Sequence, residues 1–581
     1  MIPIPFSFSR SMLLAGMVAA SWTANAQDFD RLLVNFDLVF RGGQVMDGSG
    51  TPAVKADVGI KDGVITAVGD LSQATAKREI DVTGKTIFPG IIDLHSHADE
   101  GAATTGGLRS KNDKRRAAPN LVAQGVTTVV VNMDGRSPGD ILQQKTQLEE
   151  RKFGPNAILT VGHNTVRQAV MKNDHERAAT PAEIDAMRAL VRRGMEDGAW
   201  GLSAGLEYVP GIWSTTEEVT ALVKEVAPYR GVYIVHERSS GSDPMWYVPS
   251  RDKDKPITTM LDSIKETIAI AEVTGVVSVA THIKARGEDY WGTSAEMIRA
   301  IQEARDRGVK IFADQYPYNT SGSDGSIALL PRWIEEDART ASDGATLDHA
   351  KVLADVLRDP LKAQAIRRDV LHQISRRGGA ENIVVFQHPN KEFIGKSLAE
   401  LAKQAGVDPL EMAYRLQADG FKDRFGGAQL RGYSLSEEDI ERFAAQPWVA
   451  TASDAGIALP EDGSIHARYY GTFPRKIRHY AIERGVLSVE QAVRSMTSLP
   501  AEILGVDKRG LVKEGFWADL AVIDLATIRD TATFFEPHQY PEGVDYVLVN
   551  GKFVVEAGEL TYALPGRVLT PQESMTPLDT D

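Results

Sequence analysis

Short apolar runs alternate with amphipathic helical patterns through the middle of the chain. The runs, which are typical of strands buried on both faces, lie at 127–132, 157–162, 199–203, 232–236, 277–282, 310–313 and 449–453. Helical periodicity fills intervening segments such as 181–197, 215–229 and 295–308. Repeated alternation of this kind predicts an α/β fold, a parallel (β/α)8 barrel of the TIM type over residues 89–507.

The two ends of the chain and one internal stretch depart from this alternation. Short β-type runs separated by turn residues occupy 36–81 and return at 518–555, where Asn550-Gly551 is a strong hairpin signal. We expect 27–88 and 508–570 to form one small β-sandwich domain built from both termini. A mostly helical stretch, about 332–446, is too long for a simple barrel connection and is predicted to be an insertion. The polar residues 571–581 are predicted to form a loose tail.

The first residues resemble a secretory leader. Arg10 supplies a positive charge, 11–22 is an apolar stretch too short to span a bilayer comfortably, and Ala24-Asn25-Ala26 fits a cleavage site. We therefore predict that 1–26 is a signal peptide and that the protein is secreted into a periplasm; an uncleaved membrane anchor is the alternative. No later segment is apolar over about 18 residues, so no stable membrane insertion is expected after cleavage.

Composition excludes several classes of function. A formal net charge of -14 argues against a nucleic-acid partner. The absence of cysteine excludes disulfides, zinc–thiolate sites and a cysteine nucleophile, so a bound metal must be held by His, Asp or Glu. The glycine-rich stretches lack a phosphate-loop context, which argues against nucleotide binding.

Histidine and aspartate residues follow several of the predicted strands. His95 and His97 end the apolar run 86–94, and alternate positions on a strand point to the same side of a sheet. Other predicted strands end in further candidate ligands: Asp134, His236, His282 and Asp454. Because strand ends meet at the carboxyl-terminal mouth of a barrel, we predict a metal site there. The alternatives are two exposed histidines for the His95–His97 pair, and an outward-facing turn residue for Asp134.

The segment 88–97, FPGIIDLHSH, resembles the first-strand signature of the amidohydrolase superfamily. Further strings, in order, are similar to those of its D-aminoacylase (N-acyl-D-amino-acid deacylase) branch: QGVTTVVV at 124–131, VGHNTVR at 161–167, GLSAGLEYVPG at 201–211, THIK at 281–284, ADQYPY at 313–318 and SD at 453–454. The resemblance covers almost all of the chain after the leader. It implies a zinc-dependent hydrolase of N-acyl-amino acids with one or two Zn²⁺ ions per subunit.

The resemblance also implies roles for individual residues. It assigns the metal ligands to His95, His97, His236 and His282, and the catalytic carboxylate to Asp454. At the metal-bridging position the family has cysteine in an Asn-Cys-Gly-x-Ser string, whereas this chain reads MDGRS at 133–137. A carboxylate can bridge two divalent cations through its two oxygens, so we predict that Asp134 replaces the sulfur as the bridge.

Amide hydrolysis needs an activated water, a proton acceptor and groups that bind the substrate. A bound metal activates the water, and Asp454 is predicted to take its proton and pass it to the leaving amine. Lys284, two residues beyond His282, is predicted to bind the substrate carboxylate, a role that the resemblance also implies. Three further candidates for substrate binding have a structural alternative: Tyr316 and Tyr318 as packing groups, and Arg238 as half of a salt bridge.

The predicted function is metal-dependent hydrolysis of small-molecule N-acyl-amino acids or related amides, with D-configured substrates favoured by the resemblance. The alternatives are a metallo-dipeptidase, a cyclic amide or lactam hydrolase with the same metal centre, and a metal-holding binding protein without catalysis. The sequence is compatible with a homo-oligomer as well as with a monomer.

Overall fold

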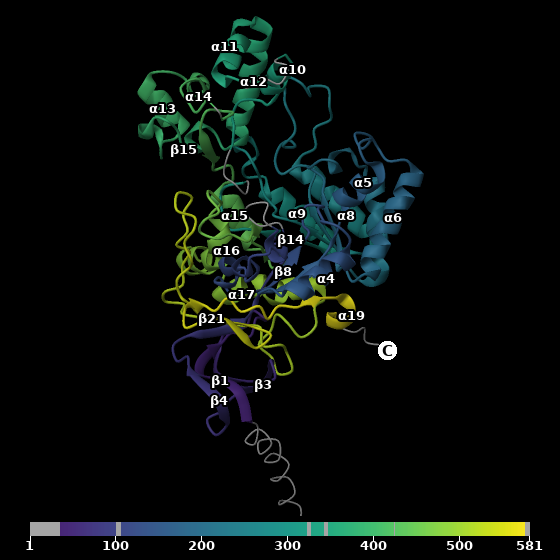
Figure 1. Cartoon of the computed structure of the whole chain (residues 1–581), viewed down its shortest axis with the longest axis vertical. Helices are drawn as coiled ribbons and strands as arrows, with labels where there is room; N and C mark the ends of the chain where they lie inside the picture. The colour runs from purple at the N-terminus through teal and green to yellow at the C-terminus, as the bar shows by residue number, and fades with distance from the viewer. Residues whose placement is uncertain (1–34, 100–105, 322–326, 342–346, 423, 576–581) are drawn as a thin grey trace, which may run out of the picture.

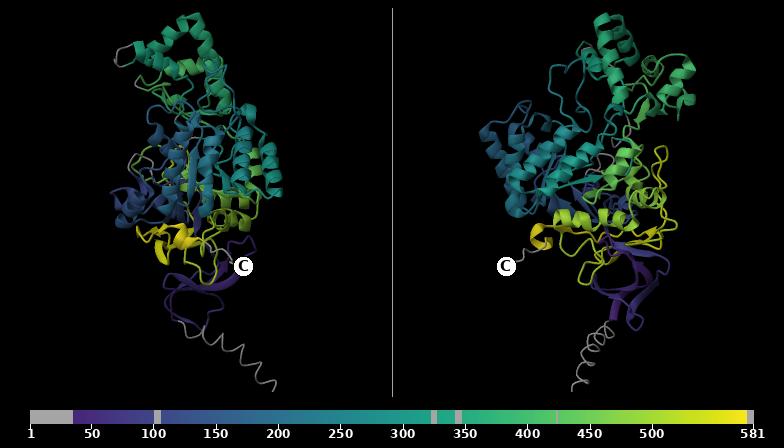
Figure 2. Two further views of the ribbon diagram at one scale, coloured as in Figure 1. Left: turned by 90° about the vertical axis from the view of Figure 1, so that its right-hand side faces the viewer. Right: turned by 180° about the vertical axis from the view of Figure 1, so that it is seen from behind.

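The computed structural model describes residues 35–575 except for 100–105, 322–326, 342–346 and 423. The predicted leader, 1–26, lies outside the described residues. Within the described part of the chain no helix is long and apolar enough to cross a membrane. Three bodies follow one another along the long axis of the molecule: a small β domain, a central barrel and a mostly helical insertion (Figures 1 and 2).

The central body is the predicted (β/α)8 barrel. Its strands run parallel in two arcs. One arc is β23-β9-β8-β6, in which β23 (Val568–Leu569) comes from the end of the chain, and the other is β10-β11-β12-β13-β14-β17. In chain order the eight barrel strands are β6 (Ile91–Asp93), β8 (Val126–Val131), β9 (Asn156–Leu159) continued after Thr160 by β10 (Val161–Gly162), β11 (Gly201–Gly205), β12 (Val232–His236), β13 (Val277–Ala280), β14 (Ile311–Gln315) and β17 (Val449–Thr451). The ring closes because β18 (Ala455–Gly456) pairs in parallel with β7 (Ser96–His97).

Helices cover the outside of the barrel, which explains the uninterrupted apolar runs of its strands. Every residue of β8, for example, is buried because one face points into the barrel and the other meets helices. The surrounding helices include α4 (Ile141–Arg151), α5 (His163–Met171), α6 (Pro181–Glu196), α7 (Thr216–Lys224), α8 (Met260–Thr274), α9 (Ser294–Asp306), α15 (Glu437–Ala444), α17 (Val489–Met496) and α18 (Ser498–Leu504). Local sequence sets their ends: Thr180 and Glu183 form a capping box at the start of α6.

The small β domain is assembled from both ends of the chain. One nine-stranded sheet joins β1 (Asn35–Val45), β2 (Val54–Lys61), β3 (Val64–Gly69), β4 (Thr75–Asp81) and β5 (Thr86–Pro89) to β19 (Leu520–Ile523), β20 (Val544–Val549), β21 (Lys552–Glu556) and β22 (Glu559–Leu560). The two halves meet where β5 pairs antiparallel with β19. The predicted hairpin at Asn550-Gly551 is present, and both residues have positive φ.

Residues 568–574 return to the barrel as a strand and a short helix, so the first part of the predicted tail is helical, and residues 576–581 lie outside the described residues. β23 (Val568–Leu569) pairs with β9, and the short helix α19 (Pro571–Ser574) follows. The backbone N–H of Asp507 donates to the carbonyl of Ser574, which ties this helix to the segment after α18. Proline at the first helical position favours such a start.

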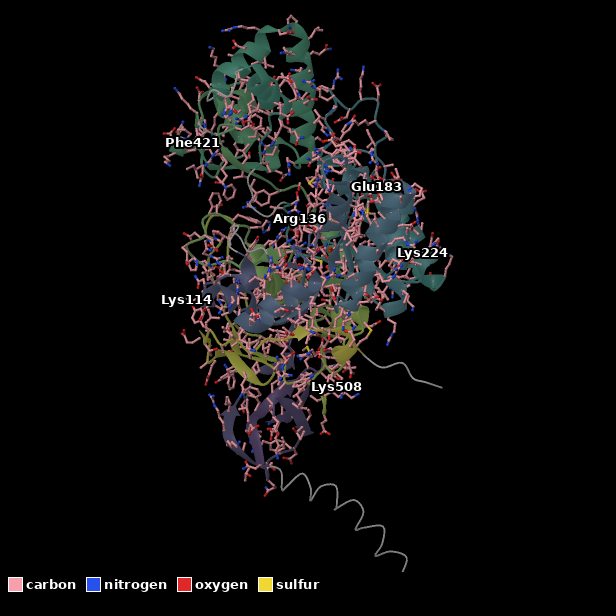
Figure 3. All side chains as sticks on the ribbon, turned by 45° about the vertical axis from the view of Figure 1, so that its right-hand side comes forward. Lys114, Arg136, Glu183, Lys224, Phe421 and Lys508 are labelled. Atoms are coloured by element: carbon pink, nitrogen blue, oxygen red, sulfur yellow. The ribbon has the colours of Figure 1, made fainter. Side chains whose placement is uncertain are left out.

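The insertion lies beyond the carboxyl ends of the barrel strands and has a hydrophobic cluster of its own. Its elements are α10 (Trp333–Ala341), α11 (His349–Arg358), α12 (Pro360–Arg376), β15 (Ile383–Gln387), α13 (Leu398–Ala405), α14 (Pro409–Ala418) and β16 (Gln429–Gly432). Figure 3 shows Arg136, just after β8, on the barrel end that faces the insertion, and Lys508 beside the small β domain. The mouth of the barrel therefore faces the insertion.

Candidate metal centre

The six residues predicted as metal ligands or catalytic carboxylate converge at this mouth. His97 lies on β7 and His95 just before it, His236 ends β12, and the other three follow β8, β13 and β17: Asp134, His282 and Asp454. Five of the six are buried, and His97 is partly exposed. Parallel strands bring these side chains together although the outermost of them are more than 300 positions apart in the sequence.

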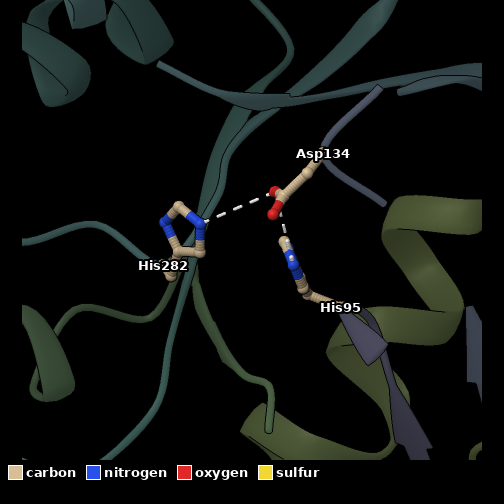
Figure 4. A group of neighbouring side chains, drawn as sticks. All are labelled: His95, Asp134 and His282. Carbon is tan, nitrogen blue, oxygen red and sulfur yellow. Dashed lines mark ion pairs between the residues drawn. The ribbon is translucent and has the colours of Figure 1, made fainter. Parts of the chain in front are cut away.

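Asp134 lies near all four imidazoles of the cluster, and Figure 4 shows its carboxylate with the rings of His95 and His282. Its Oδ1 lies 3.7 Å from His95 Nε2, 3.6 Å from His236 Nδ1 and 3.8 Å from His282 Nε2. Its Oδ2 lies 3.5 Å from His97 Nε2. The carboxylate thus points into the barrel mouth and not outward from a turn, and its two oxygens address different histidines.

Asp454 approaches the same Nε2 atoms of the two first-strand histidines as Asp134 does. Its Oδ1 is 3.2 Å from His97 Nε2 and 3.5 Å from His95 Nε2, and its Oδ2 is 3.0 Å from Arg468 Nη1. Two groups of ligand atoms result, each with its atoms within 4.8 Å of one another: His95, Asp134 and His282, and His95, His97 and Asp454.

This donor set fits a divalent metal such as zinc. Imidazole nitrogen and carboxylate oxygen are the ligands that zinc takes where cysteine is absent. The buried Oδ1 of Asp134 has no hydrogen-bond partner among the described residues, although it faces three ring nitrogens. An acceptor left in this way inside a cluster of further lone pairs is the arrangement expected where a cation binds.

Burial and local charge hold the cluster in a state suited to a cation. Burial lowers the pKa of His95 to about 4 and, together with Lys284, lowers that of His282, so both rings stay neutral. Burial alone would raise the pKa of Asp134, but the neighbouring imidazoles of His236 and His282 hold this pKa well below its usual value. Burial would also raise the pKa of Asp454, yet Arg468 and His97 keep it well below. Both carboxylates are therefore ionised at neutral pH.

The carboxylates also act on the remaining central histidine. Burial would lower the pKa of His236, but Asp134 and Glu207 together raise it to about 9. Without a metal, His236 is therefore protonated at neutral pH. Its positive charge partly compensates the two buried carboxylates, and a metal ion has to replace that proton when it binds.

Three of the imidazoles contact polar groups through the nitrogen that faces away from Asp134. His95 Nδ1 lies 2.5 Å from the hydroxyl of Thr281, and His236 Nε2 lies 2.9 Å from Glu207 Oε2. His282 Nδ1 lies 2.8 Å from Lys284 Nζ. Contacts on the outer nitrogen fix ring orientation and decide which nitrogen carries a proton.

Three cluster residues sit on backbone turns that L-residues seldom adopt. Asp134, His282 and Asp454 have φ values of 56°, 36° and 49°. A buried aspartate braces the turn before Asp454: the Ser453 N–H and hydroxyl donate to Asp93 at 2.9 and 2.5 Å. Strained turns of this kind are maintained by surrounding structure and concentrate at functional sites.

Of the predicted substrate-binding residues, Lys284 and Tyr316 lie at the cluster, whereas Tyr318 does not. Lys284 is buried beside His282, and its Nζ lies 5.7 Å from the centre of the Tyr316 ring. The guanidinium of Arg468 lies 4.7 Å from the centre of the same ring, so two cations lie near Tyr316 at the cluster. Tyr318 does not share that position, because the chain turns after β14, and its ring packs 5.3 Å from His466.

Arg238 is not brought to the cluster. Its Nε and Nη2 donate to the carboxylate of Glu266 on α8 at 2.8 and 3.1 Å. The structure thus shows the salt bridge that was the alternative to an anion contact. The partner lies 28 positions further along the chain and is brought close only by the packing of α8.

Sequence reasoning missed several groups that touch the cluster. Arg468 begins α16 (Arg468–Arg475), a helix start that carries no strand-end signal. Glu207 and Asp314 do lie at or just beyond the ends of β11 and β14, so a search for acidic residues after every predicted strand could have found them. Thr281 directly precedes His282, but its contact with His95 spans 186 positions.

A profile of the amidohydrolase family matches residues 78–555. The chain belongs to this amidohydrolase family. Among its relatives, the D-aminoacylase of Alcaligenes xylosoxydans xylosoxydans is 31% identical over 557 residues, which cover 92% of this chain and 97% of the relative. The N-acyl-D-glutamate deacylase of the same organism is 30% identical over 93% of this chain and 97% of its own length.

Solved structures of amidohydrolases agree with the fold. A crystal structure of D-aminoacylase superposes with a TM-score of 0.69 at 30% identity and covers 92% of this chain and 100% of its own. The N-acyl-D-glutamate deacylase of Bordetella bronchiseptica, complexed with zinc and a phosphonate mimic of the tetrahedral intermediate, has a TM-score of 0.68 at 28% identity, with 92% and 100% covered. The (β/α)8 barrel with a β domain is thereby confirmed.

Proposed function

We propose that this amidohydrolase hydrolyses the amide bond of N-acyl-amino acids, with D-configured substrates preferred, and releases a carboxylate and a free amino acid. The observation that carries the proposal is the position of Asp134, whose carboxylate faces four imidazoles at the barrel mouth, with Asp454 also in contact with His95 and His97. The likeness to D-aminoacylase along 92% of the chain supports the substrate class.

The residues of the cluster would hold one or two zinc ions. Asp134 would be shared, because its Oδ1 faces His236 and His282 and its Oδ2 faces His97. Zinc, when bound, lowers the pKa of a water to about 7 and polarises a carbonyl group. In the D-aminoacylase relative a binuclear metal centre has been described. The shared carboxylate is the feature of this chain that would support a second ion.

Asp454 would accept the proton of the attacking water and later donate it to the leaving nitrogen. Arg468 keeps its carboxyl ionised, as a proton acceptor must be at the start of the reaction. Its Oδ1 points toward His95 and His97, which places the proton-accepting atom inside the cluster. Lys284 and Arg468, which both lie near the Tyr316 ring, would bind the carboxylate of the substrate beside the reacting amide.

Substrate assays test the proposal directly. N-acetyl-D-methionine should be hydrolysed with a higher kcat/KM than its L-enantiomer, while a panel of dipeptides and cyclic amides should be poor substrates. Chelation should abolish turnover and zinc should restore it. Turnover of dipeptides or lactams in place of N-acyl-amino acids would favour the two alternative hydrolases, and full activity in a strong chelator would exclude the metal mechanism.

We also propose that the protein is exported to a periplasm after cleavage before Gln27. The apolar stretch after Arg10, the small residues at 24–26 and the absence of cysteine support export. Expression of the full chain in a Gram-negative host, fractionation and mass spectrometry of the purified protein test it. A periplasmic protein that begins at Gln27 is expected, whereas an intact amino terminus in the cytoplasm or membrane would contradict the proposal.

A further inference from the structure

Arg136 and Arg238 occupy matching positions, each two residues after a member of the cluster. Arg238 follows His236 and donates to the carboxylate of Glu266. Arg136 follows Asp134, is exposed, and has no carboxylate within ion-pair distance in the described part of the chain.

A tyrosine connects Arg136 to the cluster. The guanidinium carbon lies 5.2 Å from the centre of the Tyr208 ring, and that ring lies 4.3 Å from the ring of His236. Arg136, Tyr208 and His236 therefore form a chain of contacts that leads from the exposed Arg136 to the buried His236. A cation over an aromatic face is held in place without using its N–H donors, so these remain available to an anion.

The other cations of the site are already engaged closer to the reacting centre. Arg468 pairs with Asp454 at 3.0 Å, and Lys284 is buried 2.8 Å from His282. These two are placed to bind the carboxylate that every N-acyl-amino acid has next to its amide. Arg136 lies further out, on the barrel end that faces the insertion (Figure 3), where a more distant substituent of the substrate would reach it.

We propose that Arg136 recognises a second carboxylate on the substrate, so that the enzyme prefers N-acyl-amino acids that carry one carboxylate beside the amide and another several bonds away. The inference rests on the proposed function and specifies its substrate class. Guanidinium binds carboxylate through two parallel N–H donors, which gives geometric selectivity over a neutral amide of the same size. The second carboxylate belongs either to the amino-acid side chain or to the acyl group.

Matched pairs of substrates separate these two sources. One pair is N-acetyl-D-glutamate and N-acetyl-D-glutamine; the other is N-succinyl-D-methionine and its terminal amide. We expect the acid to exceed its amide about tenfold in kcat/KM in one of the two pairs, as for a charge-assisted hydrogen bond. The difference should lie in KM, because the distant carboxylate is bound equally in the ground and transition states. This difference in KM between acid and amide should become smaller when salt is added.

Variants assign the preference to Arg136. Arg136→Gln should bring the acid-to-amide ratio close to one while N-acetyl-D-methionine is hydrolysed as before, and Arg136→Lys should retain part of the preference. Arg78→Gln is the matched control, because Arg78 also lies over an aromatic ring, that of Phe553, but belongs to the small β domain. It should leave the ratio unchanged.

Two results overturn the inference alone: ratios near one for both pairs in the wild type, or an unchanged ratio in Arg136→Gln. In either case hydrolysis of N-acetyl-D-methionine shows that the proposed function still stands. Failure of the zinc-loaded wild type to hydrolyse any N-acyl-amino acid would overturn both proposals together.

Discussion

The carboxylate of Asp314 accepts a hydrogen bond from the backbone N–H of His282 at 2.6 Å. Its other oxygen accepts from the hydroxyl of Thr281 at 2.6 Å, and this hydroxyl oxygen lies 2.5 Å from His95 Nδ1. A threonine hydroxyl has one hydrogen, and here it points to Asp314, so the oxygen must accept from His95 Nδ1–H. His95 Nε2 is then the nitrogen with the lone pair, and it faces Asp134 and Asp454.

Removal of the Thr281 hydroxyl should therefore weaken metal binding. We expect Thr281→Val to lower zinc affinity by about 10- to 100-fold, since groups that orient a ligating histidine have effects of that size. Thr281→Ser, which keeps the hydroxyl, should bind zinc nearly as the wild type does. Titration calorimetry with zinc measures both.

Thr451→Val is the control for the loss of a buried threonine hydroxyl. Thr451 lies on β17, and its hydroxyl contacts Ser495 and not the cluster. Equal zinc affinities for Thr281→Val and Thr451→Val would show that the Thr281 contact does not orient His95.

Asp134 should determine how much metal the protein holds. Asp134→Asn keeps the shape of the side chain but removes the charge and one of the two oxygens that face the histidines, so a metal shared through both oxygens is lost. We expect the zinc content after dialysis to fall below that of the wild type. Asp134→Cys, which restores the family's usual residue, should recover it. Elemental analysis measures the content.

Asp140→Asn supplies the control for the Asp134 variants, because Asp140 caps α4 at the surface and should not affect zinc. Full zinc content in Asp134→Asn would contradict a shared carboxylate.

Loss of the Asp454 carboxylate should damage the chemical step more than substrate binding. For Asp454→Ala we expect kcat to fall by at least about 100-fold, the lower end for a general acid–base group. Zinc should still be held by Asp134 and the histidines that face it, so zinc content is measured alongside kcat. An unchanged kcat would exclude the proton-transfer role.

A buried ion pair should make the attachment of the insertion depend on pH. Asp243, on the loop after β12, pairs with Arg376 at the end of α12. Burial alone would raise the pKa of Asp243, but His372 and Arg376 lower it from 3.8 to about 2. A lowered folded-state pKa means that the pair stabilises the fold above pH 3.8, and that this stabilisation is lost as the pH falls toward 2.

Asp243→Asn should consequently lower the free energy of unfolding by about 3–5 kcal/mol at neutral pH, because it leaves the buried Arg376 without its carboxylate. The difference in the free energy of unfolding between variant and wild type should become smaller below about pH 4. Urea unfolding at several pH values measures it. Asp337→Asn removes an exposed pair with Arg251 on the same interface and should cost less than about 1 kcal/mol. A difference in the free energy of unfolding that does not change with pH would contradict this role of Asp243.

The local patterns of the chain determined its architecture. The uninterrupted apolar run of β8 indicated a strand covered on both faces, Asn550-Gly551 indicated a hairpin, and His95 and His97 at alternate positions indicated a strand end that presents two imidazoles to one side. Each signal depends on neighbouring residues alone, because side-chain periodicity and turn geometry are properties of a short segment.

Only the tertiary structure decided which polar groups meet. Arg238 pairs with Glu266, and Arg468 pairs with Asp454. The hydroxyl of Thr281 contacts His95 Nδ1. No periodicity in the sequence encodes these pairs, because each depends on how helices and strands far apart in the chain pack around the barrel. The sequence by itself determined the kind of site and the strand ends that supply it. Folding decided which cations are neutralised within the protein and which remain available to a substrate.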